Sequence, residues 1–400
     1  MPDILSQGRG DEPGPRRWFR LAAAAVLVVA AVLVGLRLSS SGHSPGAHHP
    51  AAARSRGPSG PTVVSLPREQ NGVAGPVRRW PASLRLPVTG SQPVWYWPAT
   101  GREQVIRGLP RRRVDYSFTR APGGWLVQPG SPSGPSCADC AGHLLPAYFL
   151  NDRGSAVSIV GLADAVAPAV RPGRLWLTSF PPGASLNSGA GHAQEVSLSG
   201  ARTGPQVPLP PGYLVVGATS RGLLLGPAPV GRATATDRLW NPADPRADRT
   251  FQNVLAVGPN EIAWAPPCVS VCRARLLNLA TGHRTVFAMP RGSTASSGTF
   301  SPDGRLLALQ VSYSTGSAGG SLAIQLVVAS VTSGRMTPVQ GTWASSDALV
   351  GFGWPADGDS LVAELGFTTK VQLTAWRPGV SRLAVVALSP REAATAIVTG

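Results

Sequence analysis

The four cysteines are the residues whose spacing points most directly to chemistry. They form two close pairs, Cys137-x-x-Cys140 and Cys268-x-x-x-Cys272. Close pairs of this kind are found in zinc sites, in redox-active dithiols and in structural disulfides. We expect two local disulfides, because an even cysteine count outside the membrane usually forms disulfides. A four-thiolate zinc site would need both loops to meet in a reducing compartment. A redox role for the first pair lacks the thioredoxin βαβ context.

Two aspartates could form a carboxylate site. Asp303 lies in Ser-Pro-Asp-Gly and Asp357 in Pro-Ala-Asp-Gly, each just before an apolar stretch. An aspartate in such a turn usually accepts hydrogen bonds from its own backbone amides. Gly304 and Gly358 would supply the positive φ that the turn needs. We therefore expect these four residues to build turns rather than to catalyse.

The sequence contains no motif that commits it to an enzyme class. There is no Gly-x-Ser-x-Gly and no pair of metal ligands, and the expected folded body holds only His143, His192 and His283. The tryptophan docking motif of quinoprotein propellers does not recur. We expect a protein that is not an enzyme and that carries no cofactor.

Arginine dominates the charge of the chain. The net charge is +16, and Lys370 is the only lysine. Residues 61–113 carry nine basic and two acidic groups, a net charge of +7. Such a region would attract anionic lipid or phosphate-rich wall polymers, although a solvated surface in an arginine-rich chain is the simpler explanation. We expect no nucleic-acid partner. The candidate anionic-surface contacts are Arg78, Arg79, Arg111, Arg112 and Arg113.

The elements that position these residues begin with one apolar segment. Residues 19–38 are long enough for a single transmembrane helix, with four arginines before the apolar core and Arg37 alone close behind it. We expect a signal anchor in the cell membrane with residues 1–18 cytoplasmic and the C-terminal body extracytoplasmic. A cleaved signal peptide is the alternative. Residues 39–72 have the Pro, Gly, Ser and His composition of a disordered linker, and 73–400 would form the folded domain.

Two classes of turn alternate along that domain. Members of the first class precede an apolar strand, and members of the second separate two shorter strands. Two hairpins per repeat make four strands per repeat, which is the unit of a β-propeller blade. The first class comprises 121–124, 171–174, 219–222, 258–260, 301–304 and 355–358; the second comprises 99–101, 151–154, 201–204, 241–245, 280–282, 332–334 and 377–379.

The spacing of these turns predicts an all-β fold with seven four-stranded blades. Six full repeats fit between about 114 and 388, and strands at 94–97 and 104–109 form the outer pair of another blade. Its inner strands could come from 393–398, which would close the ring, or from 73–90. Six or eight blades would also fit, because one misplaced half-blade changes the count. We expect a monomeric ring.

The turn sequences also carry a family resemblance. Ser-Pro-Asp-Gly-Arg-Leu-Leu-Ala at 301–308 resembles the repeat of bacterial WD40-like, TolB-type propellers, and 355–363 resembles a degraded copy. The match covers about 90 residues well and the remainder by period alone. It implies a propeller fold with an extracytoplasmic binding role, and it supplies no catalytic residues. The composition and the apolar segment together resemble those of actinobacterial envelope proteins.

Three functions are compatible with these features. The leading hypothesis is a membrane-tethered, non-catalytic binding or scaffold module for a protein, peptide or envelope glycan. The second is a propeller-based envelope hydrolase with active residues on the loops. The third is an envelope assembly factor that acts through its tail and linker.

Overall fold

The computed structural model describes most of the chain from residue 80 to residue 388. The described residues are 80–388 without 89–91, 111–115, 130–143, 183, 185–188, 229–235, 245–247, 268–271, 291, 315–321, 340–343, 346–348, 356–357, 359, 368–369 and 379–383. The predicted tail at 1–18, the anchor at 19–38 and the linker at 39–72 lie outside these residues. No helix within the described ranges has the length and apolarity to cross a membrane.

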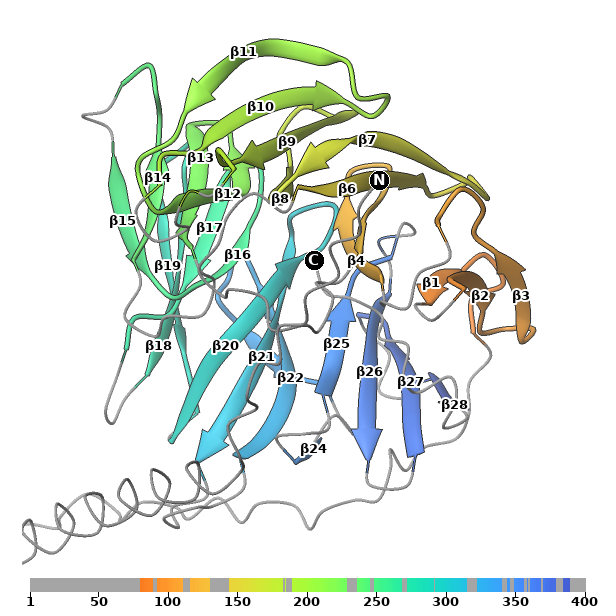
Figure 1. The fold of residues 1–400 in the computed structure, drawn as a ribbon. Coiled ribbons are helices and arrows are strands. Elements are labelled where there is room, and N and C mark those ends of the chain that lie inside the picture. Colours follow the sequence, from red (N-terminus) through yellow and green to blue (C-terminus); the bar gives the residue numbers. More distant parts are fainter. Residues whose placement is uncertain are drawn as a thin grey trace, which may run out of the picture. The chain divides into compact units, whose positions relative to one another are not determined.

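The described strands form seven separate antiparallel sheets, which are the blades of a β-propeller (Figure 1). Six sheets have four consecutive strands each, in simple up-and-down order. The predicted fold class and blade number are therefore confirmed. Blade 1 contains β1 (Leu86–Val88), β2 (Val94–Trp97) and β3 (Arg102–Val105), and blade 2 contains β4 (Tyr116–Ala121), β5 (Gly124–Pro129), β6 (Leu145–Asn151) and β7 (Val157–Ala163).

The other five blades follow without a break in order. Blade 3 contains β8 (Ala165–Pro168), β9 (Arg174–Ser179), β10 (His192–Ser197) and β11 (Arg202–Pro208). Blade 4 contains β12 (Tyr213–Thr219), β13 (Gly222–Pro227), β14 (Thr236–Trp240) and β15 (Arg249–Gln252). Blade 5 contains β16 (Val254–Val257), β17 (Glu261–Trp264), β18 (Arg273–Asn278) and β19 (Arg284–Ala288). Blade 6 contains β20 (Ser293–Phe300), β21 (Leu306–Ser314), β22 (Leu322–Ser330) and β23 (Met336–Pro338), with β24 (Ala344–Ser345) also paired to β22. Blade 7 contains β25 (Leu349–Gly353), β26 (Leu361–Phe367), β27 (Lys370–Trp376) and β28 (Ala384–Leu388).

The predicted turns lie between the strands of each blade. The turn between the first and second strands contacts the turn between the third and fourth: the amide of Asp152 donates to the carbonyl of Gly123 in blade 2, and that of Val331 donates to Arg305 in blade 6. Both turn classes therefore lie on one side of the ring, which we call the turn face. Cys272, directly before β18, lies on the opposite side.

Blade 1 differs from the others. Its β2–β3 turn closes with Gly101 donating to the carbonyl of Trp97, and Gly101 has a φ of 66°. The third-to-fourth turns of blades 5 and 6 close in the same way, so β2 and β3 are the predicted outer pair. The pair ends at Val105 rather than at 109, because this tight turn sets Trp97 opposite Arg102 and Val94 opposite Val105.

The remaining described strand of blade 1, β1, lies within the 73–90 range, which was one of the two predicted sources of the inner strands. It pairs with β2 as the second strand of the blade. No described residue forms a first strand in this blade. The alternative source at 393–398 lies outside the described residues.

The first strands of several blades share one irregularity. β12, β16, β20 and β25 each carry a bulge against the second strand, at Val216, Leu255, Ser296 and Val350. A bulge inserts one unpaired residue and increases the local twist. The first strands of neighbouring blades also contact one another around the ring, namely β8 with β12, β12 with β16, and β16 with β20.

The core consists of apolar clusters between neighbouring blades. One cluster joins β16–β19 to β20–β22, and the others lie at successive junctions around the ring. The junction between blades 7 and 1 is closed by Trp80, Leu84 and Leu86, which pack against Val362 and Leu373 of blade 7. The residues just before β1 thus bring the two ends of the ring together.

Candidate functional site

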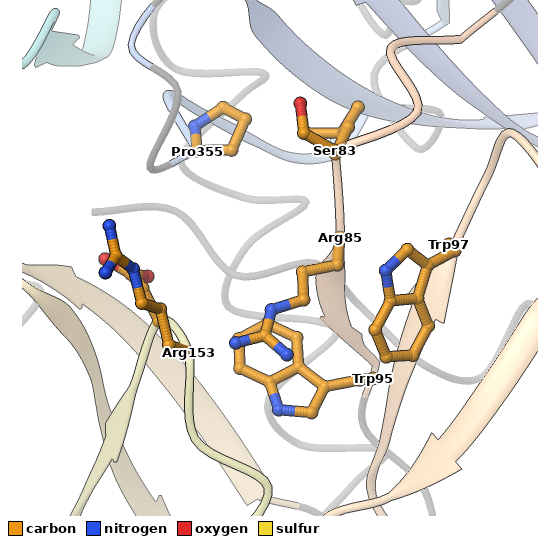
Figure 2. Close-up of a pocket in the computed structure, with 8 residues that line it drawn as sticks. Ser83, Arg85, Trp95, Trp97, Arg153 and Pro355 are labelled. Carbon is orange, nitrogen blue, oxygen red and sulfur yellow. The ribbon is translucent and has the colours of Figure 1, made fainter.

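One described cavity lies on the turn face, where the ring closes. Its volume is about 480 Å³, which is within the range of small-ligand sites. The lining residues come from the segment before β1, from β2, from the third-to-fourth turn of blade 2 and from the first-to-second turn of blade 7 (Figure 2). We call it the ring-closure cavity, and it is lined by Ser83, Leu84, Arg85, Trp95, Trp97, Asp152, Arg153 and Pro355.

Arg85 forms one side of this cavity. Its guanidinium carbon lies 4.3 Å from the ring centroid of Trp95 and 5.8 Å from that of Trp97. The two indoles come from alternate positions of β2, so both point to the same side of that strand. Figure 2 shows the guanidinium over Trp95 with Trp97 beside it. Cation–π contacts of this kind hold the guanidinium plane in a fixed orientation.

The tryptophan beneath Arg85 is itself fixed. Trp95 is 1% exposed, and its indole nitrogen donates to the carbonyl oxygen of Gly154 at 2.8 Å. Since Gly154 belongs to the β6–β7 turn, this hydrogen bond ties blade 1 to blade 2. The same turn carries Asp152 and Arg153, so one contact positions both walls of the cavity.

Asp152, the single carboxylate among the described lining residues, is already paired. Asp152 accepts two hydrogen bonds from Arg120, at 2.5 and 2.8 Å, and both side chains are 19% exposed. The Arg120 guanidinium also donates to the carbonyl of Gly124 and lies 5.2 Å from the ring of Trp125. A carboxylate held by a bidentate arginine is a poor general base. The cavity lining is therefore arranged for binding.

The electrostatic environment of Arg85 is unusual. Burial lowers the pKa of its guanidinium, and the nearby charge of Asp152 acts in the opposite direction. Among the residues that the structure describes, none forms a hydrogen bond or an ion pair with Arg85. The side chain is thus partly removed from water, and none of the described residues forms a direct ion pair with it.

The predicted turn aspartate Asp303 lies in the β20–β21 turn, away from this cavity. Its carboxylate accepts hydrogen bonds from the Ser301 hydroxyl at 2.6 Å and from the Arg305 amide at 3.0 Å. Both hydrogen bonds lower the pKa of the Asp303 carboxyl group, and the one from Ser301 has the largest effect. Gly304 has a φ of 69° and donates to the carbonyl of Ser301. The local geometry is that of a backbone-capping turn.

The other predicted site residues are only partly covered. Gly358 has a φ of 68° and donates to the carbonyl of Pro355, whereas Asp357 lies outside the described residues. The predicted anionic contacts Arg78, Arg79, Arg111, Arg112 and Arg113 also lie outside them.

One of the four cysteines is described. Cys272 is disulfide-bonded and lies directly before β18, where it packs against the core between blades 5 and 6. Cys137, Cys140 and Cys268 lie outside the described residues. The pairing of the four therefore stays a prediction.

The remaining perturbed carboxylates have structural surroundings. Burial raises the pKa of Asp237, which accepts from the Val254 amide, and that of Glu261, which accepts from Asn260 and Asn278. Within the described ranges, no cluster of three or more His, Cys, Asp or Glu residues could hold a metal ion.

Sequence reasoning did not identify the ring-closure cavity. The signal was present in Arg85 and in the Trp-x-Trp of β2, where alternation puts both indoles on one face of a strand. Asp152 and Arg153 could not be added from the sequence, because they lie in the next blade. Only the ring packing brings these two segments together.

No protein-family model matches the chain, and no curated protein matches it. Among solved structures, TolB from Acinetobacter baumannii is similar, with 13% identity, 74% of this chain and 76% of that chain covered, and a TM-score of 0.42. The β-propeller domain of the trilobed protease from Pyrococcus furiosus is 8% identical, with 75% of this chain and 90% of that chain covered and a TM-score of 0.47. A Synechocystis apocarotenoid oxygenase mutant is 11% identical, with 79% of this chain and 91% of that chain covered and a TM-score of 0.41. The propeller assignment itself rests on the strand pairing described above.

Proposed function

We propose that this chain is a membrane-tethered, extracytoplasmic β-propeller that acts as a non-catalytic binding module for a protein, peptide or envelope glycan. Residues 19–38 would anchor it, and the arginines before them would keep the N-terminus in the cytoplasm. The propeller would then be displayed outside the membrane.

The ring-closure cavity is the observation that carries this proposal. Its volume of about 480 Å³ suits a small group or a short segment of a polymer. Its walls combine two indole rings with two guanidinium groups, and its one carboxylate is engaged by Arg120. Aromatic and arginine side chains at a concave site are typical of binding surfaces. This lining favours recognition over the hydrolase alternative.

The proposal is tested by filling the cavity. Ser83 is an exposed lining residue, so Ser83→Trp would occupy the cavity without entering the core. Ser333, an exposed serine of the β22–β23 turn, provides the matched control Ser333→Trp on the same face. Full-length protein in detergent is applied to an array of synthetic envelope glycans and short peptides, and binding is measured by biolayer interferometry.

We expect at least one array member to bind the wild type and the Ser333→Trp variant alike, and to lose binding to the Ser83→Trp variant. Equal binding by both variants would place recognition elsewhere. Conversion of a bound probe to product by the wild type would replace the binding proposal with the hydrolase alternative.

A further inference from the structure

Among the described lining residues, the side chains of the ring-closure cavity offer hydrogen-bond donors almost exclusively. Arg85 and Arg153 each present guanidinium N–H groups, and arginine has no acceptor. The acceptor capacity of Asp152 is directed at Arg120. Among the other described lining residues, the Ser83 hydroxyl can donate and accept, and the Trp97 indole N–H is a further donor. A neutral sugar needs acceptors for its hydroxyl protons, so this lining favours a ligand that is itself rich in acceptors.

The guanidinium of Arg85 is presented as a preorganised anion-binding group. The contact with Trp95 covers one face of its plane, so its N–H groups are available at the edge of that plane. A planar carboxylate matches such an edge with two parallel hydrogen bonds. Because no described residue pairs with Arg85, a ligand carboxylate would supply the missing counter-ion.

A second cation lies across the cavity. Arg153 is exposed on the β6–β7 turn, and its backbone amide is held by the side chain of Asn151 at 2.9 Å. In Figure 2, Arg153 lies on the left of the view and Arg85 lies over Trp95 to its right, with Pro355 and Ser83 above them. Two cations therefore flank one space that also has apolar walls.

We propose that the ring-closure cavity binds an acidic peptide segment, with a Glu or Asp carboxylate on Arg85 and Arg153 and adjoining apolar atoms against Trp97 and Pro355. This inference rests on the proposed binding function and names its ligand. A peptide fits better than a glycan because its backbone leaves few hydroxyl donors to satisfy, whereas its carboxylate supplies the acceptors that the cavity lacks.

The test compares two peptides that differ only in charge with two anions that are not peptides. The probes are a Glu/Gly decapeptide, its Gln/Gly isostere, a tetramer of galacturonate and inorganic phosphate, each titrated against the full-length protein by tryptophan fluorescence. We expect the Glu peptide to bind at least about tenfold more tightly than the Gln peptide, because only the Glu carboxylate accepts charge-assisted hydrogen bonds from the two guanidinium groups. Binding should also weaken as the salt concentration rises.

Variants assign the effect to the arginines. Arg85→Gln and Arg153→Gln should each weaken binding of the Glu peptide about tenfold. Arg85→Lys should also weaken it, because lysine keeps the charge without the planar edge. Arg284→Gln, on the exposed outer strand β19, is the control and should leave affinity unchanged. Arg153 is exposed, so its variant stays informative if the Arg85 variants fold poorly.

Three results would overturn the inference: equal affinity for the Glu and Gln peptides, tighter binding of galacturonate or phosphate than of the Glu peptide, or no effect of the arginine variants. If Ser83→Trp still abolishes binding of some array member in that case, the binding function stands and the ligand assignment fails. If Ser83→Trp has no effect on any probe, both fail.

Discussion

The ion pair between Arg120 and Asp152 should be a measurable contributor to the stability of the propeller. It joins the first strand of blade 2 to the β6–β7 turn, directly behind the ring-closure cavity. Asp152→Asn removes the negative charge with little change in shape, and Arg120→Gln removes the positive charge together with the guanidinium group. The double variant tests whether the two residues act together.

The expected magnitude follows from the burial of the pair. Exposed ion pairs are worth about 0–1 kcal/mol, and breaking a fully buried pair costs about 3–5 kcal/mol. At 19% exposure on each side and with two hydrogen bonds, we expect about 2 kcal/mol for Asp152→Asn. Arg120→Gln should cost about 3 kcal/mol, because it also loses the Gly124 carbonyl bond and the Trp125 contact.

The assay is urea denaturation of the wild type, both single variants and the double variant, monitored by tryptophan fluorescence. The double variant should be only about as unstable as Arg120→Gln, which gives a coupling energy of about 2 kcal/mol. A coupling below about 0.5 kcal/mol would show that solvent screens the pair and that Asp152 is not held. In that case Asp152 would be available to Arg85, and the description of the cavity as donor-rich would be wrong.

Three further perturbations test the turns and junctions. The lowered pKa of Asp303 predicts a stabilising contribution that is complete above the ordinary aspartate pKa of about 3.9 and is lost as pH falls through the lower folded value. In pH-dependent melting, the wild type should therefore lose its advantage over Asp303→Asn only in that acidic range. A difference that stays constant with pH would contradict the pKa shift. In urea denaturation, Gly304→Ala should lower the free energy of unfolding by about 1 kcal/mol, because the φ of Gly304 is positive and its surroundings are open. Gly222→Ala should lower it by about 3 kcal/mol, because a Cβ there would overlap the carbonyl of Trp240. Equal costs for the two variants would refute this contrast. Trp354→Phe should lower the unfolding free energy by about 2 kcal/mol, because it removes the hydrogen bond from the indole N–H to the Thr299 carbonyl, which joins blade 7 to blade 6. An unchanged denaturation midpoint would argue against that junction.

The repeat architecture was predictable because a propeller blade is built from local interactions. Antiparallel strands joined by short turns need only neighbouring residues to define their register. The Ser-Pro-Asp-Gly turn at 301–304 therefore identifies its hairpin without knowledge of the ring. Six full repeats predicted between about 114 and 388 agree with strands that run from Tyr116 to Leu388.

The limits of blade 1 were less well predicted, and the reason is physical. Its second strand, β1, is three residues long and has Pro87 at its centre, so it shows little strand pattern. Its stability comes from packing against blade 7, through Trp80, Leu84 and Leu86. A contact between the first and the last blade leaves no periodic signal in the sequence.

The sequence by itself determined the all-β class, the repeat of two hairpins per blade and the turn role of residues such as Gly304, since these depend on local alternation and backbone geometry. The tertiary structure alone decided where a ligand could bind. Arg85 and Trp95 become a site only when ring closure sets them beside Asp152 and Arg153 of the next blade and Pro355 of the last. These partners lie tens to hundreds of residues apart in the chain, so their proximity depends on the closed ring and not on any local pattern.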